Sequence, residues 1–218
     1  MSHATTLPRP TGMTYIEPLP ARTAGLFVKL VYWFARRRLG RVPAPVGIMA
    51  HNRAVLSAVA GFELAFERAG ALDVRLKELV TLKTAMLVGC RFCIDIGTSL
   101  ARNHGVSAAV LMDLPLYETS PLYTPLERRV LEFAVAMTST PMVMPKALVD
   151  TLREELGVPA LVELTAAISW ENQRARFNHA FGAQEEGFSD QTVCLLPAAT
   201  STVDSVSPVD SVSPVTAS

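Results

Sequence analysis

Residues that favour helix starts and helix stops recur through the middle of this chain and constrain its fold more than any other feature. Asp73 is suited to cap a helix that ends at Gly89. Thr124-Pro125-Leu126-Glu127 forms a capping box with proline at the first helical position. The alternation of apolar and polar residues that is typical of strands is essentially absent, and Val and Ile occur at helical spacing. The sequence therefore predicts an all-α fold.

The predicted helices form one domain of residues 21–195, which suits a chain of 218 residues. They cover residues 22–39, 50–69, 73–88, 90–104, 108–113, 124–137, 145–157 and 159–181. Residues 1–20 contain four prolines and little periodicity, so we expect an irregular N-terminal arm. Residues 203–208 repeat immediately as 209–214, within a stretch of Ser, Thr, Val, Pro and Asp. Because such a stretch cannot bury enough apolar area to offset its ordering entropy, we expect residues 196–218 to be a disordered low-complexity tail.

The composition favours association between copies of the chain. Apolar residues make up 50% of it and the mean hydropathy is +0.28, which is high for a soluble monomer. We therefore expect a homo-oligomer in which subunit contacts cover part of the apolar surface. The 20 basic residues balance 20 acidic ones, so charge gives no argument for a nucleic-acid partner.

Several features favour a soluble cytoplasmic protein without a membrane partner. The apolar run from Ala24 to Phe34 has about half of the ~20 residues that a spanning helix needs, and Lys29 interrupts it. The first residues lack the charged start and apolar run of a secretory signal. The three cysteines, one close pair and the distant Cys194, fit a reducing compartment better than a disulfide scaffold.

Cys90 and Cys93 form a Cys-x-x-Cys pair at the start of the predicted helix 90–104. Helical spacing brings the two sulfurs within disulfide reach, and the positive end of the helix stabilises a thiolate. Three interpretations are open: a redox pair, half of a metal site, or two small buried side chains. A zinc site needs two further ligands at suitable spacing, and only Cys194 and four scattered histidines are at hand. The pattern favours a redox pair and no metal.

Glu78 lies twelve residues before Cys90, on a mostly apolar stretch of the preceding predicted helix. If the two helices pack together, Glu78 faces the thiols from a weakly solvated place. Burial there raises the pKa of a carboxyl and makes it a plausible proton acceptor for a thiol. The alternative is a solvent-facing side chain between Lys77 and Lys83. These residues alone leave both interpretations open.

Two stretches of the chain resemble the carboxymuconolactone decarboxylase and alkyl hydroperoxidase D superfamily. They are Arg75-Leu76-Lys77-Glu78 and Gly89-Cys90-Arg91-Phe92-Cys93-Ile94-Asp95, and the segment Asn172–His179 is similar to the closing segment of that superfamily. The resemblance is strongest over residues 50–110. It implies an all-helical, alkyl hydroperoxidase D-like fold that usually assembles as trimers or hexamers.

The resemblance also implies a peroxidase chemistry for the cysteine pair. In the family's peroxidases the residue at the place of Cys93 attacks a peroxide and becomes a sulfenic acid. The residue at the place of Cys90 resolves it as a disulfide, and the one at the place of Glu78 relays protons. A dithiol partner, such as a lipoyl-bearing protein, returns the pair to thiols. Neither a metal nor a bound organic cofactor is implied.

One position departs from the family pattern. The family's histidine, four residues after the second cysteine, is Gly97 here, and glycine cannot carry a proton. His104, about two helical turns further on the same face, and His179 on the last predicted helix are candidate substitutes. Arg91, between the cysteines, either favours a thiolate or is a surface cation. Asp95 is expected to point elsewhere on the helix.

Two alternatives to a peroxidase stay open. Trp170-Glu171 lies one turn before Arg174 and Arg176, and such a surface could bind a small carboxylated lactone, the substrate of a decarboxylase-like lyase. The lyase members of the superfamily lack a redox cysteine pair, which argues against that activity. The other alternative is a non-catalytic helical oligomer that keeps the fold without the reaction.

Overall fold

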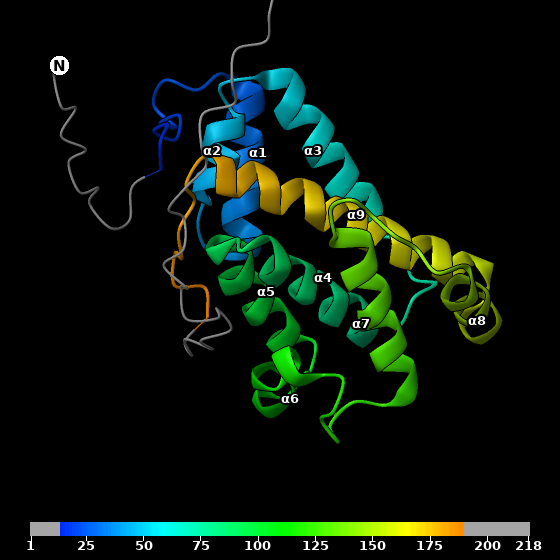
Figure 1. Cartoon of the computed structure of the whole chain (residues 1–218). Helices are drawn as coiled ribbons and strands as arrows, with labels where there is room; N and C mark the ends of the chain where they lie inside the picture. Colours follow the sequence, from blue (N-terminus) through cyan, green and yellow to red (C-terminus); the bar gives the residue numbers. More distant parts are fainter. Residues whose placement is uncertain (1–13, 190–218) are drawn as a thin grey trace, which may run out of the picture.

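The computed structural model describes residues 14–189, and this range consists of helices and the segments that connect them (Figure 1). The helices are α1 (Leu26–Leu39), α2 (Ala44–Met49), α3 (Arg53–Phe66), α4 (Val74–Val88), α5 (Arg91–Asn103), α6 (Ala108–Met112), the 3-10 turn η1 (Leu114–Leu116), α7 (Pro125–Thr138), α8 (Lys146–Leu156) and α9 (Val158–Ala180). No strand occurs between residues 14 and 189, so the predicted all-α fold is confirmed.

Helix α4 lies at the centre of the main core. It packs against α5, α7 and α9, and its residues Leu79, Val80, Leu82 and Ala85 are fully buried. Burial of a leucine side chain stabilises a fold by about 1.5–3 kcal/mol, so α4 is the element on which the neighbouring helices are fixed. Helix α9 runs between α3 on one side and α4 and α5 on the other (Figure 1).

A second, smaller core joins α1, α2 and α3. It contains Val28 and Tyr32 from α1 and Leu56 from α3, and the Tyr32 hydroxyl donates to the carbonyl of Leu19 at 2.7 Å. The segment after α9 links this part to α5. Asp95 accepts backbone N–H bonds from Glu186, Phe188 and Ser189 at 2.9–3.0 Å, while the Arg41 guanidinium lies over the Phe188 ring.

The predicted helix starts are present as hydrogen bonds. Asp73 accepts the N–H groups of Arg75 and Leu76, and both bonds of the Thr124–Glu127 capping box form. Gly89 ends α4 with φ +78°, a conformation that favours glycine. These local signals explain why the observed boundaries of α4 and α7 agree closely with the predicted ones.

The structure departs from the sequence prediction before α3. The helix predicted for 50–69 begins at Arg53, because the side chain of Asn52 caps it. Residues 44–49 form the separate helix α2, which the prolines at 43 and 45 concealed. A proline in the first turn is tolerated because the N–H there has no acceptor within the helix. The predicted tail 196–218, Cys194 and the start of the N-terminal arm lie outside the described residues, so the domain boundaries stay predictions.

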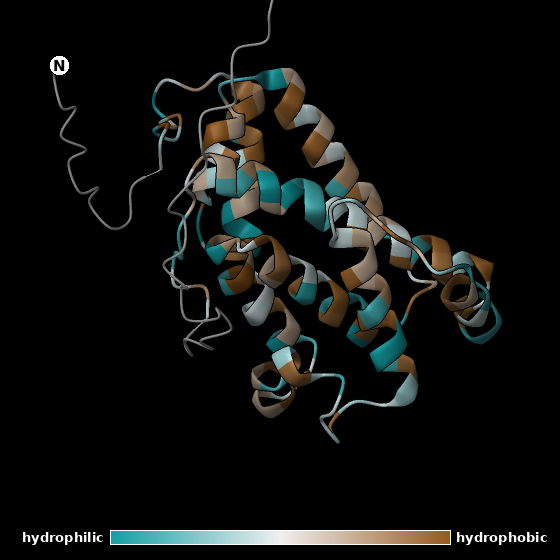
Figure 2. Ribbon diagram, viewed as in Figure 1, coloured by the Kyte–Doolittle hydropathy of each residue, from teal (hydrophilic) through white to brown (hydrophobic). Residues whose placement is uncertain are grey.

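Apolar residues remain exposed on the single chain, and Figure 2 shows hydrophobic residues along several turns of α3. On α1, Leu26, Leu30 and Trp33 are each more than half exposed, and α3 adds Val55, Phe62 and Leu64. Such a surface accords with the high mean hydropathy of the sequence. Within residues 14–189 no helix combines the length and the hydropathy that crossing a membrane requires.

Candidate active site

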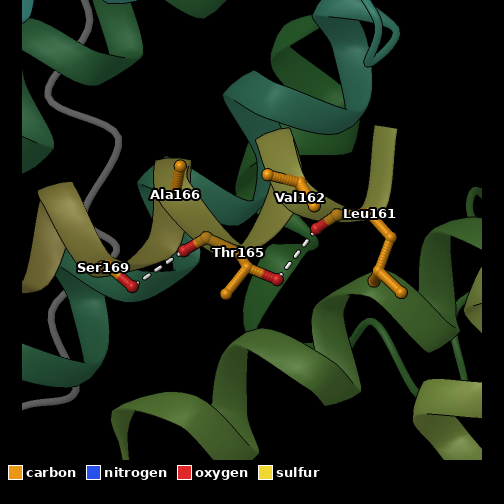
Figure 3. A pocket seen from close by; sticks show the side chains of 5 residues that line it. All are labelled: Leu161, Val162, Thr165, Ala166 and Ser169. Carbon is orange, nitrogen blue, oxygen red and sulfur yellow. Dashed lines mark hydrogen bonds between the residues drawn. The ribbon is translucent and has the colours of Figure 1, made fainter. Parts of the chain in front are cut away.

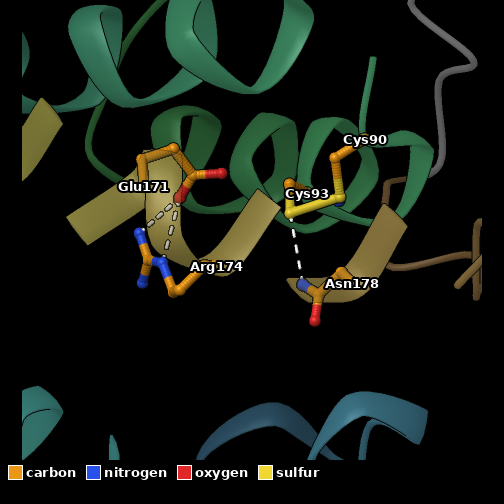
Figure 4. Close-up of a disulfide and its surroundings, with 5 residues drawn as sticks. All are labelled: Cys90, Cys93, Glu171, Arg174 and Asn178. Carbon is orange, nitrogen blue, oxygen red and sulfur yellow. Dashed lines mark hydrogen bonds and ion pairs between the residues drawn. A yellow bond between two sulfur atoms is a disulfide. The ribbon is translucent and has the colours of Figure 1, made fainter. Parts of the chain in front are cut away.

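The cysteine pair lies at the corner between α4 and α5. The left-handed turn at Gly89 reverses the chain, so that Cys90 becomes the N-cap residue of α5 and Cys93 lies in its first turn. The structure joins the two as a disulfide, with their Cα atoms 5.3 Å apart (Figure 4). Cys90 Sγ accepts the backbone N–H of Cys93 at 3.2 Å. The start of α5 therefore supplies a local donor that would stabilise Cys90 as a thiolate.

A second donor reaches the pair from a distant part of the chain. Asn178, buried on α9, donates its side-chain N–H to Cys93 Sγ at 3.3 Å (Figure 4). The sequence pattern alone does not distinguish Asn178 from its neighbours in the segment Asn172–His179. A signal was present, because the buried face of α9 that holds Leu164, Ile168 and Ala175 continues at helical spacing through Glu171 and Asn178. Polar residues at core positions of this kind are functional candidates.

Glu78 projects from α4 and is mostly buried, not solvent-facing as the alternative interpretation had it. Its Oε1 lies 2.8 Å from Nδ1 of His104, the residue that ends α5. Burial raises the pKa of Glu78, and the contact with His104 partly opposes that rise. The structure thus brings together the predicted relay carboxyl and one of the two candidate histidines.

The Glu78–His104 pair lies at the opposite end of α5 from the two sulfurs. Cys93 and His104 are separated by eleven residues, which corresponds to about 16 Å of helix rise. Within residues 14–189 the hydrogen bonds of the two sulfurs come from the Cys93 N–H and from Asn178, and none joins a sulfur to Glu78. Gly97 lies between them, and a Cβ atom there would stand 3.4 Å from Leu82 Cδ1. A proton that moves between Cys93 and Glu78 therefore needs an intermediate carrier.

Helix α9 also places a charged cluster next to Glu78. Glu171 is buried, and its Oε2 accepts two bonds from Arg174, from Nε at 3.0 Å and from Nη2 at 2.6 Å. The third guanidinium nitrogen, Nη1, donates to Glu63 of α3 at 3.0 Å. Trp170 Nε1 also donates to Glu63, at 2.8 Å. The guanidinium of Arg174 is thus occupied by two carboxylates.

Other candidates from the sequence lie elsewhere. Arg91 is half exposed and forms an ion pair with Glu185. His179 is exposed, and it is its buried neighbour Asn178 that bonds Cys93. Asp95 faces the segment after α9, as its three backbone bonds show. Between residues 14 and 189 no group of three or more His, Cys, Asp or Glu side chains is arranged to hold a metal ion.

A hollow on the outer side of α9 is separate from the cysteine pair (Figure 3). It is lined by Leu161, Val162, Thr165, Ala166 and Ser169. The hydroxyls of Thr165 and Ser169 donate to carbonyls four residues earlier in the same helix, so the hollow presents mainly apolar groups. It contains none of the candidate catalytic residues.

Sequence comparison assigns a family to this helical domain. The chain belongs to the carboxymuconolactone decarboxylase family, whose model matches residues 53–136. It is 30% identical over 183 residues to the uncharacterized protein YnjA of Escherichia coli, covering 84% of this chain and 98% of YnjA. It is 32% identical over 104 residues to the alkyl hydroperoxide reductase Rv2159c of Mycobacterium tuberculosis, which covers 45% of this chain and 30% of that protein.

Solved structures show that the fold is alkyl hydroperoxidase D-like. The alkylhydroperoxidase AhpD core of a peroxidase-related protein from Ralstonia eutropha superposes with a TM-score of 0.72 at 16% identity, covering 83% of this chain and 96% of that chain. The debrominase Bmp8 superposes with a TM-score of 0.73 at 23% identity, with the same coverage of 83% and 96%. Proteins with this fold therefore include a debrominase as well as a peroxidase-related protein.

Proposed function

We propose that this protein is a thiol-dependent peroxidase, or a related dithiol–disulfide oxidoreductase, that uses Cys90 and Cys93. The observation that carries the proposal is that each sulfur has its own hydrogen-bond donor, from the start of α5 for Cys90 and from Asn178 for Cys93. Donors of this kind stabilise the thiolate, which is the reactive form of cysteine. The relationship to an alkyl hydroperoxide reductase supports the same chemistry.

The reaction takes place in three steps. The Cys93 thiolate attacks the outer oxygen of a hydroperoxide, an S–O bond forms, the O–O bond breaks, and the alkoxide takes up a proton and leaves as an alcohol. The Cys90 thiolate then attacks the sulfur of the Cys93 sulfenic acid, forming the disulfide while hydroxide leaves with a proton as water. A dithiol finally reduces the disulfide and becomes a disulfide itself.

Both sulfurs are buried, and this burial limits the reductant. A dithiol on a slender arm, such as a lipoyl group carried by a protein, suits the site better than a folded surface that presents two cysteines. A reduced pair also requires a reducing compartment, and we therefore place the protein in the cytoplasm.

We also propose that the protein acts as a homo-oligomer, a trimer or a hexamer. The exposed apolar residues of α1 and α3 support association, since a monomer would leave Leu26, Leu30 and Trp33 in water. Sedimentation or light scattering of the full chain tests this proposal, and a monomer at micromolar concentration would contradict it.

The decarboxylase-like alternative is less well supported. It requires a cation free to bind a substrate carboxylate, and the guanidinium of Arg174 is shared between Glu63 and Glu171. The non-catalytic alternative predicts an unreactive cysteine pair, and it is decided by the same experiment as the peroxidase.

The experiment is to treat the reduced protein with one equivalent of hydroperoxide and to follow free thiols and peptide masses. The proposal predicts rapid formation of a Cys90–Cys93 disulfide, loss of turnover in Cys93→Ser, and a trapped sulfenic acid on Cys93 in Cys90→Ser. Thiols that survive unchanged would contradict it, and activity that persists in Cys90→Ser would point to a lyase. A parallel assay with 2,3,4-tribromopyrrole, the compound bound in one Bmp8 structure, tests reductive debromination by the same pair.

A further inference from the structure

Glu171 presents a buried oxygen atom that has no partner among the described residues. Both bonds from Arg174 reach Oε2, while Oε1 is buried and accepts no hydrogen bond. Figure 4 shows Oε1 pointing to the side of α9 on which the cysteines lie. Glu171 and Asn178 are seven residues apart, two helical turns, and share the buried face of α9. An unpaired buried carboxylate oxygen is costly unless it takes part in binding or in proton transfer.

The position of Glu171 on α9 bears on how the two separate parts of the site, Cys93 with Asn178 and Glu78 with His104, are connected. Asn178 contacts Cys93 at one end, and Glu78 contacts His104 at the other end. Glu171 is on the same helix as Asn178, and the charge of Glu78 is one of the effects that raise the pKa of Glu171. The helix rise of α5 keeps Cys93 and Glu78 apart, and Gly97 supplies no side chain between them. Glu171 is therefore a buried carboxyl of α9 that lies two helical turns from Asn178 and feels the charge of Glu78.

Charged groups face Glu171 from three helices. Arg174 of α9 favours its ionised form, while Glu63 of α3 and Glu78 of α4 oppose it. Burial is the largest effect and raises the pKa of Glu171. A raised carboxyl pKa approaches that of a cysteine thiol, and proton transfer is most efficient between groups of similar pKa. Glu78 in turn feels His104, Arg174 and Lys77, all of which favour its ionised form.

We propose that Glu171 carries the thiol proton between Cys93 and Glu78, and that His104 exchanges this proton with water. Cys93 and the Glu171 side chain are only 6% and 3% exposed, whereas the side chains of Glu78 and His104 are 13% and 47% exposed. The path thus leads from a buried sulfur to the surface. This inference rests on the proposed function in one respect, namely that Cys93 reacts as a thiolate.

The proton balance of the path is simple. Cys93–SH and the Glu171 carboxylate become Cys93–S⁻ and the Glu171 carboxylic acid, and Glu171 then passes the proton to Glu78. When peroxide is cleaved, the proton returns along the same groups to the leaving alkoxide. In the second step, the proton of Cys90 follows to the leaving hydroxide. The only oxidant required is the peroxide itself.

The test measures the thiolate directly, without peroxide. In a Cys90→Ser background, the rate of Cys93 alkylation by iodoacetamide is followed by peptide mass against pH. The relay predicts that the alkylation rate, plotted against pH, shows a plateau between two ionisations. The reason is that an internal carboxyl accepts the thiol proton, so the thiol and the carboxyl titrate as a pair. In Glu171→Gln we expect a single ionisation at higher pH, and an alkylation rate at pH 6 that is lower by a factor of roughly ten or more.

Glu163→Gln is the matched control. Glu163 is another buried glutamate of α9, eight residues before Glu171, and it pairs with Lys77 and accepts N–H bonds from Ala71 and Leu72. Its replacement removes a buried carboxylate from the same helix and should keep the plateau. A folded Glu171→Gln protein with the wild-type profile would overturn the proposal.

A second variant covers the case in which Glu171→Gln does not fold. Glu171→Asp keeps a titratable group, so the alkylation rate should keep its plateau, although the pH values at which the plateau begins and ends should shift. A single ionisation in this variant would overturn the proposal. The two proposals can also fail separately. A protein that ignores peroxide but loses its plateau in Glu171→Gln supports the relay and refutes the peroxidase. A protein that forms the disulfide with peroxide but keeps its plateau in Glu171→Gln supports the peroxidase and refutes the relay.

Discussion

Replacement of Asn178 by alanine tests how much α9 contributes to the reactivity of Cys93. The bond from Asn178 Nδ2 to Cys93 Sγ is 3.3 Å long and buried on both sides. A hydrogen bond to a charged group stabilises it by about 1.5–3 kcal/mol, and 1.36 kcal/mol corresponds to one pKa unit. Loss of the donor should therefore raise the pKa of the Cys93 thiol by about 1–2 units. Below that pKa, the thiolate fraction falls by about 10–100-fold.

The assay is the pH dependence of Cys93 alkylation in the Cys90→Ser background, with the rate of peroxide reduction as a second measure. Asn172→Ala is the matched control, since Asn172 is also an asparagine of α9 but bonds Thr138 and the carbonyl of Ile168. That variant removes a side-chain amide from the same helix without touching a sulfur. An unchanged thiol pKa in a folded Asn178→Ala protein would refute the role of this bond.

Three further predictions follow from other contacts. His104→Ala removes a contact that favours ionised Glu78, so the pKa of Glu78 should rise further above its usual value, as carboxyl titration by NMR would show. Glu127 has a lowered pKa, because the bonds from Thr124 and Arg75 outweigh its burial. The contribution of Glu127 to the stability of the fold is thus complete above its pKa in the unfolded chain, and it is lost as the pH falls through its lower pKa in the folded protein. Glu127→Gln should therefore lower the free energy of unfolding in urea by about 0.5–2 kcal/mol at pH 7 and by much less at pH 3. Asp95→Ala should increase amide hydrogen exchange at residues 186, 188 and 189, and protection that persists there would contradict the anchoring role of Asp95.

The sequence predicted those features that depend on neighbouring residues. The caps at Asp73 and Thr124, the stop at Gly89 and the position of Cys90 at a helix start all lie within four residues of the groups that they bind. Helix α2 could not be predicted in this way. Prolines such as those at 43 and 45 are typical of loops, and they are also tolerated at the start of a helix, so they do not distinguish the two. Local rules fix where helices begin and end, and they do not say which helix faces which.

The side of the site that α9 provides could not be predicted in this way. Asn178 and Cys93 are 85 residues apart, and only the packing of α9 on α4 and α5 brings them together. The burial of Glu78 had the same origin, since its neighbours Lys77 and Lys83 made a solvent-facing position equally plausible. What the sequence did contain was a pattern: Glu171 and Asn178 occupy core positions of α9, and a polar residue at such a position requires a partner.

The two sulfurs therefore depend on the fold to different degrees, and this difference bears on the roles that we propose for them. Cys90 takes its donor from the first turn of its own helix, three residues away, so its thiolate is stabilised whenever α5 is formed. Cys93 takes its side-chain donor from α9, so this bond stabilises its thiolate only while α9 is docked on α5. A resolving cysteine must act after the peroxide has reacted and the site has changed, and a local donor suits that task. An attacking cysteine should be activated only in the assembled site, where the leaving oxygen can also receive its proton, and a donor from a distant helix meets that condition.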